Sequence, residues 1–202
     1  MARIKHTKNE LKAQRDALAR YQRYLPTLQL KKQQLQLEVR NVESRLEQHR
    51  AETAELRRQL ESWVRLLAEP VDLDSYLRWT QVRVGTSNIA GVTIPVLESV
   101  EFERELPDLF HTPAWVDDAL NVLEELMRRR VQELVLEQQL SALRAELRTT
   151  SQRVNLFEKV KIPETRENIR VIRIFLGDQM TAEIARAKIA KGKSAERVTS
   201  AG

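Results

Sequence analysis

Residues 11–67 read LKAQRDALARYQRYLPTLQLKKQQLQLEVRNVESRLEQHRAETAELRRQLESWVRLL, and this stretch decides the fold. When Leu11 is taken as a first a position, apolar residues occupy the a and d positions of a heptad repeat for about eight heptads. This repeat predicts a coiled-coil seam on a helix of roughly 85 Å. One helix cannot bury such a seam alone, so a partner helix is expected.

A second apolar repeat follows Thr112–Pro113, a pair typical of a helix start. Its apolar positions change phase near Leu134, which predicts a stutter. Pro163 interrupts this repeat, and Gly177 weakens a helix by about 1 kcal/mol. The repeat is carried by Leu120, Leu123, Met127, Leu134, Leu136, Leu140, Leu143, Leu147, Thr150, Val154 and Phe157, and its spacing continues through Lys161, Glu164, Asn168, Val171, Phe175, Ala182, Ala185 and Ile189.

The two seams most simply pair as an antiparallel hairpin of helices. If Leu67 lies level with residue 126, the numbers of facing residues add up to about 193. Pro26 would then lie close to Pro163. An interior proline removes a backbone hydrogen bond, so we expect a shared kink at that level.

The segment between the seams contains two runs rich in β-branched residues, Gln81–Gly85 and Val92–Phe102. They predict a β-hairpin with its turn near Asn88–Gly91. An isolated two-stranded hairpin is marginally stable, so we expect this one to rest on the helices or on another protein. Pro95 places part of it at a sheet edge.

The expected fold class is all-α, a long antiparallel two-helix coiled coil with a small irregular or β-hairpin middle segment. Its expected parts are an N-terminal coiled-coil helix (1–67), a connecting segment with the hairpin (68–112), a C-terminal coiled-coil helix (113–190) and a basic flexible tail (191–202). The coiled-coil seam is assigned to Leu11, Leu18, Leu25, Leu28, Leu35, Val39, Val42, Leu46, Leu56, Leu60, Leu147, Val154 and Phe157.

Three polar residues, Lys32, His49 and Thr53, interrupt the first seam. Polar groups at core positions lower the stability of a coiled coil, but they can fix its register and its partner. We interpret His49 as a rim or register residue rather than a metal ligand, because no second ligand lies at helical spacing from it.

Composition and charge narrow the possible functions. The chain has 31% charged residues, 5% aromatic residues and no cysteine, which suits long helices and excludes disulfides and thiolate metal sites. No signal peptide or long apolar run occurs, so we expect a cytoplasmic protein. Lys and Arg outnumber Asp and Glu by 10 to 3 in residues 1–40 and by 11 to 6 in 150–202, whereas 41–149 has 13 against 20. Basic ends suit nucleic acid, an anionic membrane surface or an acidic protein partner.

Motifs for catalysis are absent from the sequence. It contains no glycine-rich phosphate loop, nucleophile elbow or His-Glu-x-x-His motif, so we predict no catalytic residues, no cofactor and no metal. Arg166, Arg170 and Arg173 share one helical face. Phosphate binding, contact with a charged protein wall and plain solvation all remain open for this face.

Specific motifs lie at the two ends of the chain. The N-terminal motifs are HTKNEL (residues 6–11) and YLPTLQLKKQQL (24–35). The C-terminal motifs are RVNLFE (153–158), VKIP (160–163) and ENI (167–169), which is followed by Ile172. Together and in this order they resemble the D subunit of the rotary V/A-type ATPases. The middle of the chain is not covered by this resemblance.

The resemblance implies a non-catalytic central shaft whose paired terminal helices lie inside a hexameric head of catalytic and regulatory subunits. The middle segment would face a small companion stalk subunit and a funnel-shaped subunit on the membrane ring. The protein would be peripheral to the membrane, without insertion and without nucleic acid. The basic ends supply candidates for head contact, namely Arg166, Arg170, Arg173, Lys188 and Lys191. The hairpin supplies candidates for companion-subunit contact, namely Val82, Val84, Val92, Ile94, Val100 and Phe102.

One stretch departs from the family pattern. Residues 176–180 read LGDQM, where the family usually has an acidic and strongly helical segment, so we expect the helix to loosen there. The alternative function is a basic coiled-coil scaffold or nucleic-acid-binding protein, whose affinity would fall steeply with salt. Trp63, Trp79 and Trp115 flank the middle segment rather than the basic ends, which disfavours stacking on nucleic-acid bases.

Overall fold

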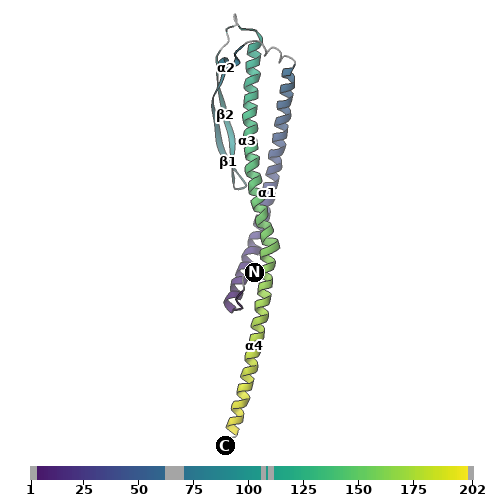
Figure 1. Cartoon of the computed structure of the whole chain (residues 1–202), viewed down its shortest axis with the longest axis vertical. Helices are drawn as coiled ribbons and strands as arrows, with labels where there is room; N and C mark the ends of the chain where they lie inside the picture. The colour runs from purple at the N-terminus through teal and green to yellow at the C-terminus, as the bar shows by residue number, and fades with distance from the viewer. Residues whose placement is uncertain (1–3, 62–70, 106–107, 109–111, 200–202) are drawn as a thin grey trace. The chain divides into compact units, whose positions relative to one another are not determined.

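The computed structural model describes residues 4–61, 71–105, 108 and 112–199. The chain divides into two units, which are described separately: Lys31–Thr150, and the residues up to Leu30 together with those from Ser151 onward. The predicted fold class is confirmed, since long helices carry one small antiparallel hairpin between them (Figure 1). In chain order the elements are α1 (Lys8–Glu61), α2 (Leu73–Tyr76), β1 (Leu77–Ile89), β2 (Val92–Arg104), α3 (Trp115–Leu156), the π-helix η2 (Phe157–Lys161) and α4 (Ile162–Thr199).

The first turn of α1 is capped by Thr7. Its hydroxyl oxygen accepts a hydrogen bond from the backbone N–H of Glu10 at 3.2 Å, and its carbonyl accepts one from the N–H of Leu11 at 2.9 Å. A threonine at this position satisfies N–H groups that have no partner within the helix. Every described a and d position of the first heptad repeat is buried or half-buried, so the apolar stripe is the inward face of α1.

Facing residues in the terminal unit establish the register of the antiparallel helices. The rings of Tyr21 and Phe157 lie 5.1 Å apart, and those of His6 and Phe175 lie 4.8 Å apart. The numbers of these pairs add up to 178 and 181, so the predicted register was wrong. The error arose because the prediction left the first turns of α3 without a facing residue. Pro26 therefore faces residues that precede Phe157, well away from Pro163.

The π-helix η2 explains a second error in the predicted seam. A π turn contains one residue more than an α turn, so it rotates everything that follows by one position. Of the seam positions predicted after Phe157, Lys161 and Asn168 are half-buried, whereas Glu164, Val171, Ala182, Ala185 and Ile189 are exposed. Phe175 is also exposed, although its ring lies against that of His6. The residues that are buried after η2 are Ile162, Thr165 and Ile172.

Pro163 is the second residue of α4 and lies two residues after the end of η2. Because proline has no N–H group, the α-helical hydrogen bond to residue 159 cannot form there, and a π turn accommodates such a local defect. The helical path is therefore kept across a proline that was predicted to interrupt it. The hydroxyl of Thr165 donates a hydrogen bond to the carbonyl of Lys161 at 2.6 Å and satisfies one of the nearby acceptors.

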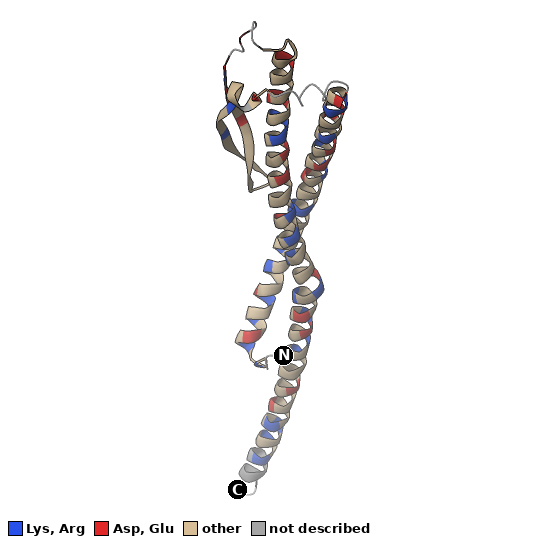
Figure 2. Cartoon of the chain, turned by 45° about the horizontal axis from the view of Figure 1, so that its top comes forward, with Lys and Arg blue, Asp and Glu red and all other residues tan. Residues whose placement is uncertain are grey.

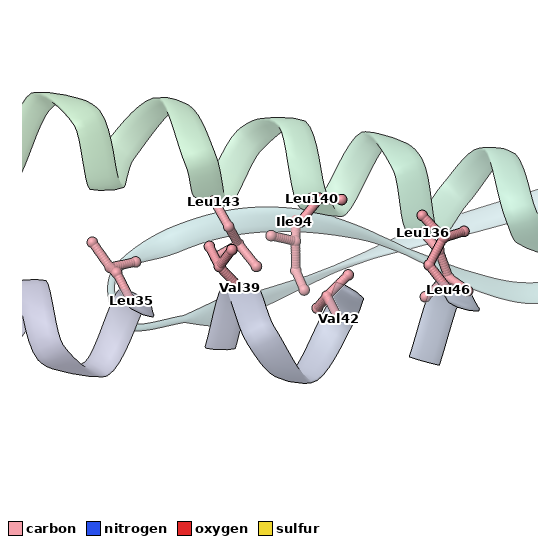
Figure 3. Close-up of a cluster of buried hydrophobic side chains, with 8 residues drawn as sticks. All are labelled: Leu35, Val39, Val42, Leu46, Ile94, Leu136, Leu140 and Leu143. Carbon is pink, nitrogen blue, oxygen red and sulfur yellow. The ribbon is translucent and has the colours of Figure 1, made fainter. Parts of the chain in front are cut away.

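The core of the Lys31–Thr150 unit joins three elements (Figure 3). Ile94 of β2 lies between the two helices, so the hairpin contributes directly to the seam instead of resting on its surface. Leu35, Val42 and Leu143 are completely buried. The cluster consists of Leu35, Val39, Val42 and Leu46 from α1, Ile94 from β2, and Leu136, Leu140 and Leu143 from α3.

The hairpin strands are longer than predicted and are joined by only two residues. Ala90 and Gly91 have φ angles of +51° and +77°, as a two-residue type I′ turn requires. The side chain of Asn88 accepts a hydrogen bond from the N–H of Gly91 at 3.0 Å. The buried amide of Gln139 donates a 2.6 Å hydrogen bond to the carbonyl of Pro95, which ties β2 to α3.

A second cluster lies at the other end of the hairpin. Leu77, Val116 and Leu120 are buried there, and partly buried residues from α2, the hairpin and α3 pack around them. Arg104 of β2 donates hydrogen bonds to Asp117 at 2.9 Å and to Asn121 at 2.6 Å. Both ends of the hairpin are thereby held against α3, beside which it runs (Figure 1).

Helix α4 continues without a break through Gly177 to Thr199. The expected loosening at residues 176–180 is therefore not observed, and helix also occupies most of the segment that was expected to form a flexible tail. One glycine costs a helix only about 1 kcal/mol. The following residues are rich in Ala, Lys, Arg and Glu, which favour helix. None of the described helices is long and apolar enough to cross a membrane.

Candidate interaction surfaces

Ion pairs connect α1 and α3 along the Lys31–Thr150 unit. Arg50 bridges two carboxylates of α3, with its Nε 2.7 Å from Glu133 and one terminal nitrogen 2.5 Å from Glu137. Arg144 of α3 reaches back to Glu43 at 2.6 Å. Acidic and basic residues alternate along both helices (Figure 2). Such pairs contribute little stability individually, but they select one register between two helices.

The pKa values of these groups reflect the same contacts. The hydrogen bond from Arg50 holds the pKa of Glu133 below its ordinary value, and the hydrogen bond to Glu133 raises the pKa of Arg50. The pKa of Glu52 is lowered by the hydrogen bond from Gln48 and then by the one from Arg129. The carboxylates therefore stay ionised at neutral pH and hold the helices by charge.

Two of the three polar residues of the first seam, His49 and Thr53, find partners within the chain. Nε2 of His49 lies 2.8 Å from the backbone carbonyl oxygen of Arg129, to which it donates in the tautomer that carries a proton on Nε2. The hydroxyl of Thr53 donates to the carbonyl of His49 at 2.8 Å. The contact of His49 with α3 agrees with its interpretation as a register residue.

The basic face of α4 forms where the sequence predicted it. Arg166, Arg170 and Arg173 are exposed and surround a shallow hollow of about 420 Å³ together with Ile169 and Ile174. Arg170 is the member of this face that forms an ion pair with a described residue, Glu167, at 2.7 Å. This hydrogen-bonded pair lowers the pKa of Glu167 and raises that of Arg170.

The following part of α4 is exposed on all sides. Every residue from Gly177 to Lys193 is exposed, including the other two head-contact candidates, Lys188 and Lys191. Met180, Ile184 and Ile189 each have more than half of their surface exposed. No described residue of the terminal unit covers these apolar side chains.

The companion-contact candidates of the hairpin divide into three groups. Ile94 and Val100 are buried in the chain's own core, and Val92 packs against it, so these side chains are occupied within the chain. Phe102 and Val82 are half-buried. The remaining candidate, Val84, is about half exposed and is the most accessible of the six.

Sequence reasoning missed an apolar groove between the hairpin and α3. Trp79 and Phe102 line it from the hairpin, and Met127 and Leu134 line it from α3. Leu134 was assigned to the second seam. It lines the groove instead, and 41% of its surface is exposed. The phase change near this residue was a signal that it does not belong to the core.

The described residues contain no group of three or more His, Cys, Asp or Glu side chains arranged to hold a metal ion.

The residues assigned to the coiled-coil seam fall into two classes of burial. Buried are Leu35, Val39, Val42, Leu46 and Val154, and half-buried are Leu11, Leu18, Leu25, Leu28, Leu56, Leu60, Leu147 and Phe157. Trp63 and Leu67, at the end of the predicted first seam, lie outside the described residues.

The fold places the chain in the class of antiparallel helical-hairpin proteins that carry a β-hairpin between their two long helices. The sequence model of the family of ATP synthase D subunits matches residues 10–192. The chain belongs to this family, in agreement with the resemblance found at its two ends.

Individual relatives match the chain over nearly its whole length. The V-type ATP synthase D subunit of Borreliella burgdorferi is 44% identical over 191 residues, which cover 95% of both chains. Proteins of the same name from Chlamydia pneumoniae and Chlamydia felis are each 34% identical. The former match covers 94% of this chain and 92% of the relative, and the latter covers 97% and 96%. The middle segment is therefore included in the similarity.

Proposed function

We propose that this chain is the central stalk, or rotor shaft, of a V/A-type rotary ATPase. In this role it transmits torque between the ATP-handling hexameric head and the membrane ion-translocating ring. It has no catalytic role, because ATP is bound and converted by the head. Membership of the family of ATP synthase D subunits, together with similarity over almost the whole chain, supports this function.

The exposed part of α4 is the observation that carries the proposal. Residues 177–193 form helix without any described residue of their unit against them, although Met180, Ile184 and Ile189 are apolar. Helices in water gain most of their stability from packing an apolar face. A single helix with exposed apolar side chains therefore suits a binding site formed by other subunits, and the lining of the head supplies one.

The partners follow from the same proposal. In this proposal the exposed residues Arg166, Arg170 and Arg173 of α4 contact the catalytic and regulatory subunits of the head, and the exposed Lys188 and Lys191 extend this surface. The hairpin side of the Lys31–Thr150 unit is left for the small companion stalk subunit and the funnel-shaped subunit. The chain would thus be a peripheral, cytoplasmic part of a membrane-bound complex.

Torque transmission requires that the two helices do not slide past each other. The Lys31–Thr150 unit meets this requirement by a shared apolar core and by ion pairs from Arg50 and Arg144 across the helices. Interdigitated side chains permit only discrete registers. These contacts support the role of the unit as a stiff element.

The proposal is tested by mixing the full-length chain with a purified hexameric head and determining the mass of the complex. We expect one copy of the chain per hexamer. A double substitution, Ile184→Glu with Ile189→Glu, should weaken binding by at least about tenfold because it places charge on the apolar face. Leu37→Glu, an equally exposed leucine of α1, serves as the matched control.

Replacing Arg166, Arg170 and Arg173 by Glu provides a second test in the same head-binding experiment. If this face contacts the walls of the head, reversal lowers the affinity and changes its salt dependence. Absence of any complex with the head would contradict the stalk proposal. An unchanged affinity after charge reversal would contradict only the role of these arginines.

A further inference from the structure

The inward positions of the C-terminal helix change their spacing at η2. On either side of η2 they follow one another in steps of three or four residues, as in a coiled-coil seam. Between Phe157 and Ile162 the step is five residues, and the backbone N–H of Ile162 donates to the carbonyl of Phe157, as in a π turn. The π-helix therefore holds one residue more than the seam requires. The inward positions, all buried or half-buried, are Val154, Phe157, Ile162, Thr165, Ile169, Ile172 and Leu176.

This extra residue decides which side of α4 meets α1. One residue of an α-helix corresponds to a rotation of about 100°, so α4 is turned by about that angle compared with an uninterrupted helix. The uninterrupted helix would turn Glu164 and Val171 inward, whereas both are exposed here. Ile162 and Ile172 are buried instead. Since a carboxylate is costly to bury and an isoleucine is not, the sequence favours the observed setting.

A stripe of exposed residues on α4 takes its direction from this setting. Its first three members, Arg166, Arg170 and Arg173, each directly follow an inward position. At about 100° per residue, the stripe lies roughly at a right angle to the inward face of α4. In an uninterrupted helix it would point almost directly away from α1. Further along α4 the same stripe contains the exposed residues Ile184, Lys188 and Lys191.

Basic residues of α1 lie on the same flank of the helix pair. Lys12 and Arg15 are exposed and directly follow the half-buried Leu11 and Gln14, and the exposed Lys8 lies one heptad before Arg15. In antiparallel helices the sense of rotation, viewed from one end, is reversed between the two chains. Positions that follow the inward residues of each helix therefore lie on one common flank.

A contact on the opposite flank agrees with this geometry. Phe175 directly precedes the half-buried Leu176, and His6 lies one heptad before the residue that precedes Gln14. The rings of His6 and Phe175 lie 4.8 Å apart. Positions that precede inward residues thus meet on one flank, which leaves the basic residues of both helices together on the other.

The charges on that flank are not matched across the helices. Among the described residues, none of the ion pairs joins α1 to α4, whereas the Lys31–Thr150 unit pairs opposite charges across its helices. Like charges beside a seam lower the stability of a helix pair. The flank therefore suits a protein surface that carries carboxylates. We call it the basic flank, and it consists of Lys8, Lys12, Arg15, Arg166, Arg170 and Arg173.

We propose that the extra residue of η2 is a positioning element for assembly. It turns the arginines of α4 onto the flank that carries the basic residues of α1, and an acidic surface of the head binds this basic flank. Pro163 cannot donate the α-helical hydrogen bond, so it keeps the extra residue in the π turn. The inference rests on the proposed function, which supplies the head as the partner.

The first test asks whether the extra residue sets the direction of α4. The chain has no cysteine, so Val171→Cys or Ile172→Cys supplies a single thiol for labelling with a maleimide. Each is introduced into the otherwise unmodified chain and into two variants. The deletion chain combines Pro163→Ala with removal of Lys159, which leaves an uninterrupted helix in the observed setting. The insertion chain combines Pro163→Ala with one alanine added after Lys159, which turns α4 further.

We expect Ile172→Cys to react at least about tenfold more slowly than Val171→Cys in the unmodified and deletion chains, because a buried thiol reacts only when the structure opens locally. In the insertion chain this difference should vanish or reverse. Equal rates of the two thiols in the deletion chain overturn the proposal.

The second test measures binding of the full-length chains to the purified hexameric head. The deletion chain should bind within about threefold of the unmodified chain, and the insertion chain at least about tenfold more weakly. Loss of binding by the deletion chain overturns the proposal, since the direction of α4 is kept there. Unchanged binding by the insertion chain also overturns it, because the head would then not recognise that direction.

Substitutions on α1 test the basic flank without changing the number of residues in the helix. Arg15→Glu should weaken head binding by at least about fivefold and alter its salt dependence. Arg20→Glu is the matched control, because Arg20 is equally basic and exposed but precedes the half-buried Tyr21 and so does not lie on the basic flank. Equal effects of the two substitutions contradict the proposal even if the insertion chain fails to fold.

These measurements also separate the two levels of inference. If the unmodified chain does not bind the head, the stalk function is wrong, while the labelling rates still decide whether η2 sets the direction of α4. If the unmodified chain binds the head but the insertion chain and the Arg15→Glu chain bind equally well, the stalk function stands and the positioning role is wrong.

Discussion

The two units of this chain use the same antiparallel helices in different ways. In Lys31–Thr150, residues from α1, the hairpin and α3 are completely or almost completely buried together. In the terminal unit, Val154, Ile162 and Ile172 are buried, whereas the apolar a and d residues of α1 are only half-buried. A third element, the hairpin, makes the difference, because two helices alone leave the flanks of their seam open to solvent.

This difference in burial suggests that the two units have different roles. A unit that buries its own core can be stable and stiff without partners, whereas one that leaves apolar positions half-covered gains stability when another surface covers it. The proposed stalk function requires both properties. The following predictions test whether the difference in burial is a difference in energy.

The largest expected effect is in the three-element core. Leu143→Ala should lower the free energy of unfolding by about 3 to 4 kcal/mol, because it removes a completely buried side chain and leaves a cavity. Leu18→Ala, in the half-buried part of α1, should cost about 1 kcal/mol or less. Urea unfolding followed by circular dichroism measures both values, and equal losses would contradict the comparison.

The next prediction tests which face of α4 is buried after the π-helix, by comparing two neighbouring substitutions. Ile172→Ala should cost about 2 kcal/mol or more because this side chain is completely buried, whereas its neighbour Val171 is exposed and Val171→Ala should cost less than about 0.5 kcal/mol. The same unfolding experiment applies. If Val171→Ala were the more damaging change, the seam would follow the phase predicted from sequence.

The smallest expected change in stability concerns the ion pairs of the Lys31–Thr150 unit. The folded-state pKa of Glu133 is lowered, chiefly by its hydrogen bond with Arg50, so its contribution to stability is present above the ordinary carboxyl pKa of about 4.5. That contribution is lost as the pH falls through the lowered pKa. Glu133→Gln should therefore reduce the difference between the urea midpoints at pH 7 and pH 3.

Glu158→Gln on η2 is the matched control for this prediction, since no ion pair connects Glu158 to another described residue. It should leave the difference between the two midpoints nearly unchanged. An identical pH response of the Glu133→Gln and unmodified chains would show that the ion pair contributes nothing measurable, as many surface pairs do.

The periodicity of the sequence predicted the helices, their antiparallel pairing and the central hairpin. It predicted the inward face of α1 well, because every residue from Lys8 to Glu61 belongs to one α-helix and the heptad phase is retained. It failed after Phe157 because a π turn inserts one residue without any change in composition. The register failed because periodicity gives a helix its face but not the level of its partner.

The candidate surfaces show the same limit. The basic face of Arg166, Arg170 and Arg173 could be predicted because helical spacing alone brings these residues together. The groove could not, since Trp79 and Leu134 come from a strand and a helix that only the docking of the hairpin makes neighbours. Docking of the hairpin also buries Ile94 and Val100, two of the companion-contact candidates.

The sequence by itself thus determined the heptad seam of residues 11–67, the class of fold and the family, because each depends on local spacing or on short motifs. The tertiary structure alone decided the register, the phase of α4 and the open groove beside Trp79. These features depend on contacts between residues far apart in the chain, and on a proline whose missing hydrogen bond is accommodated by a π turn.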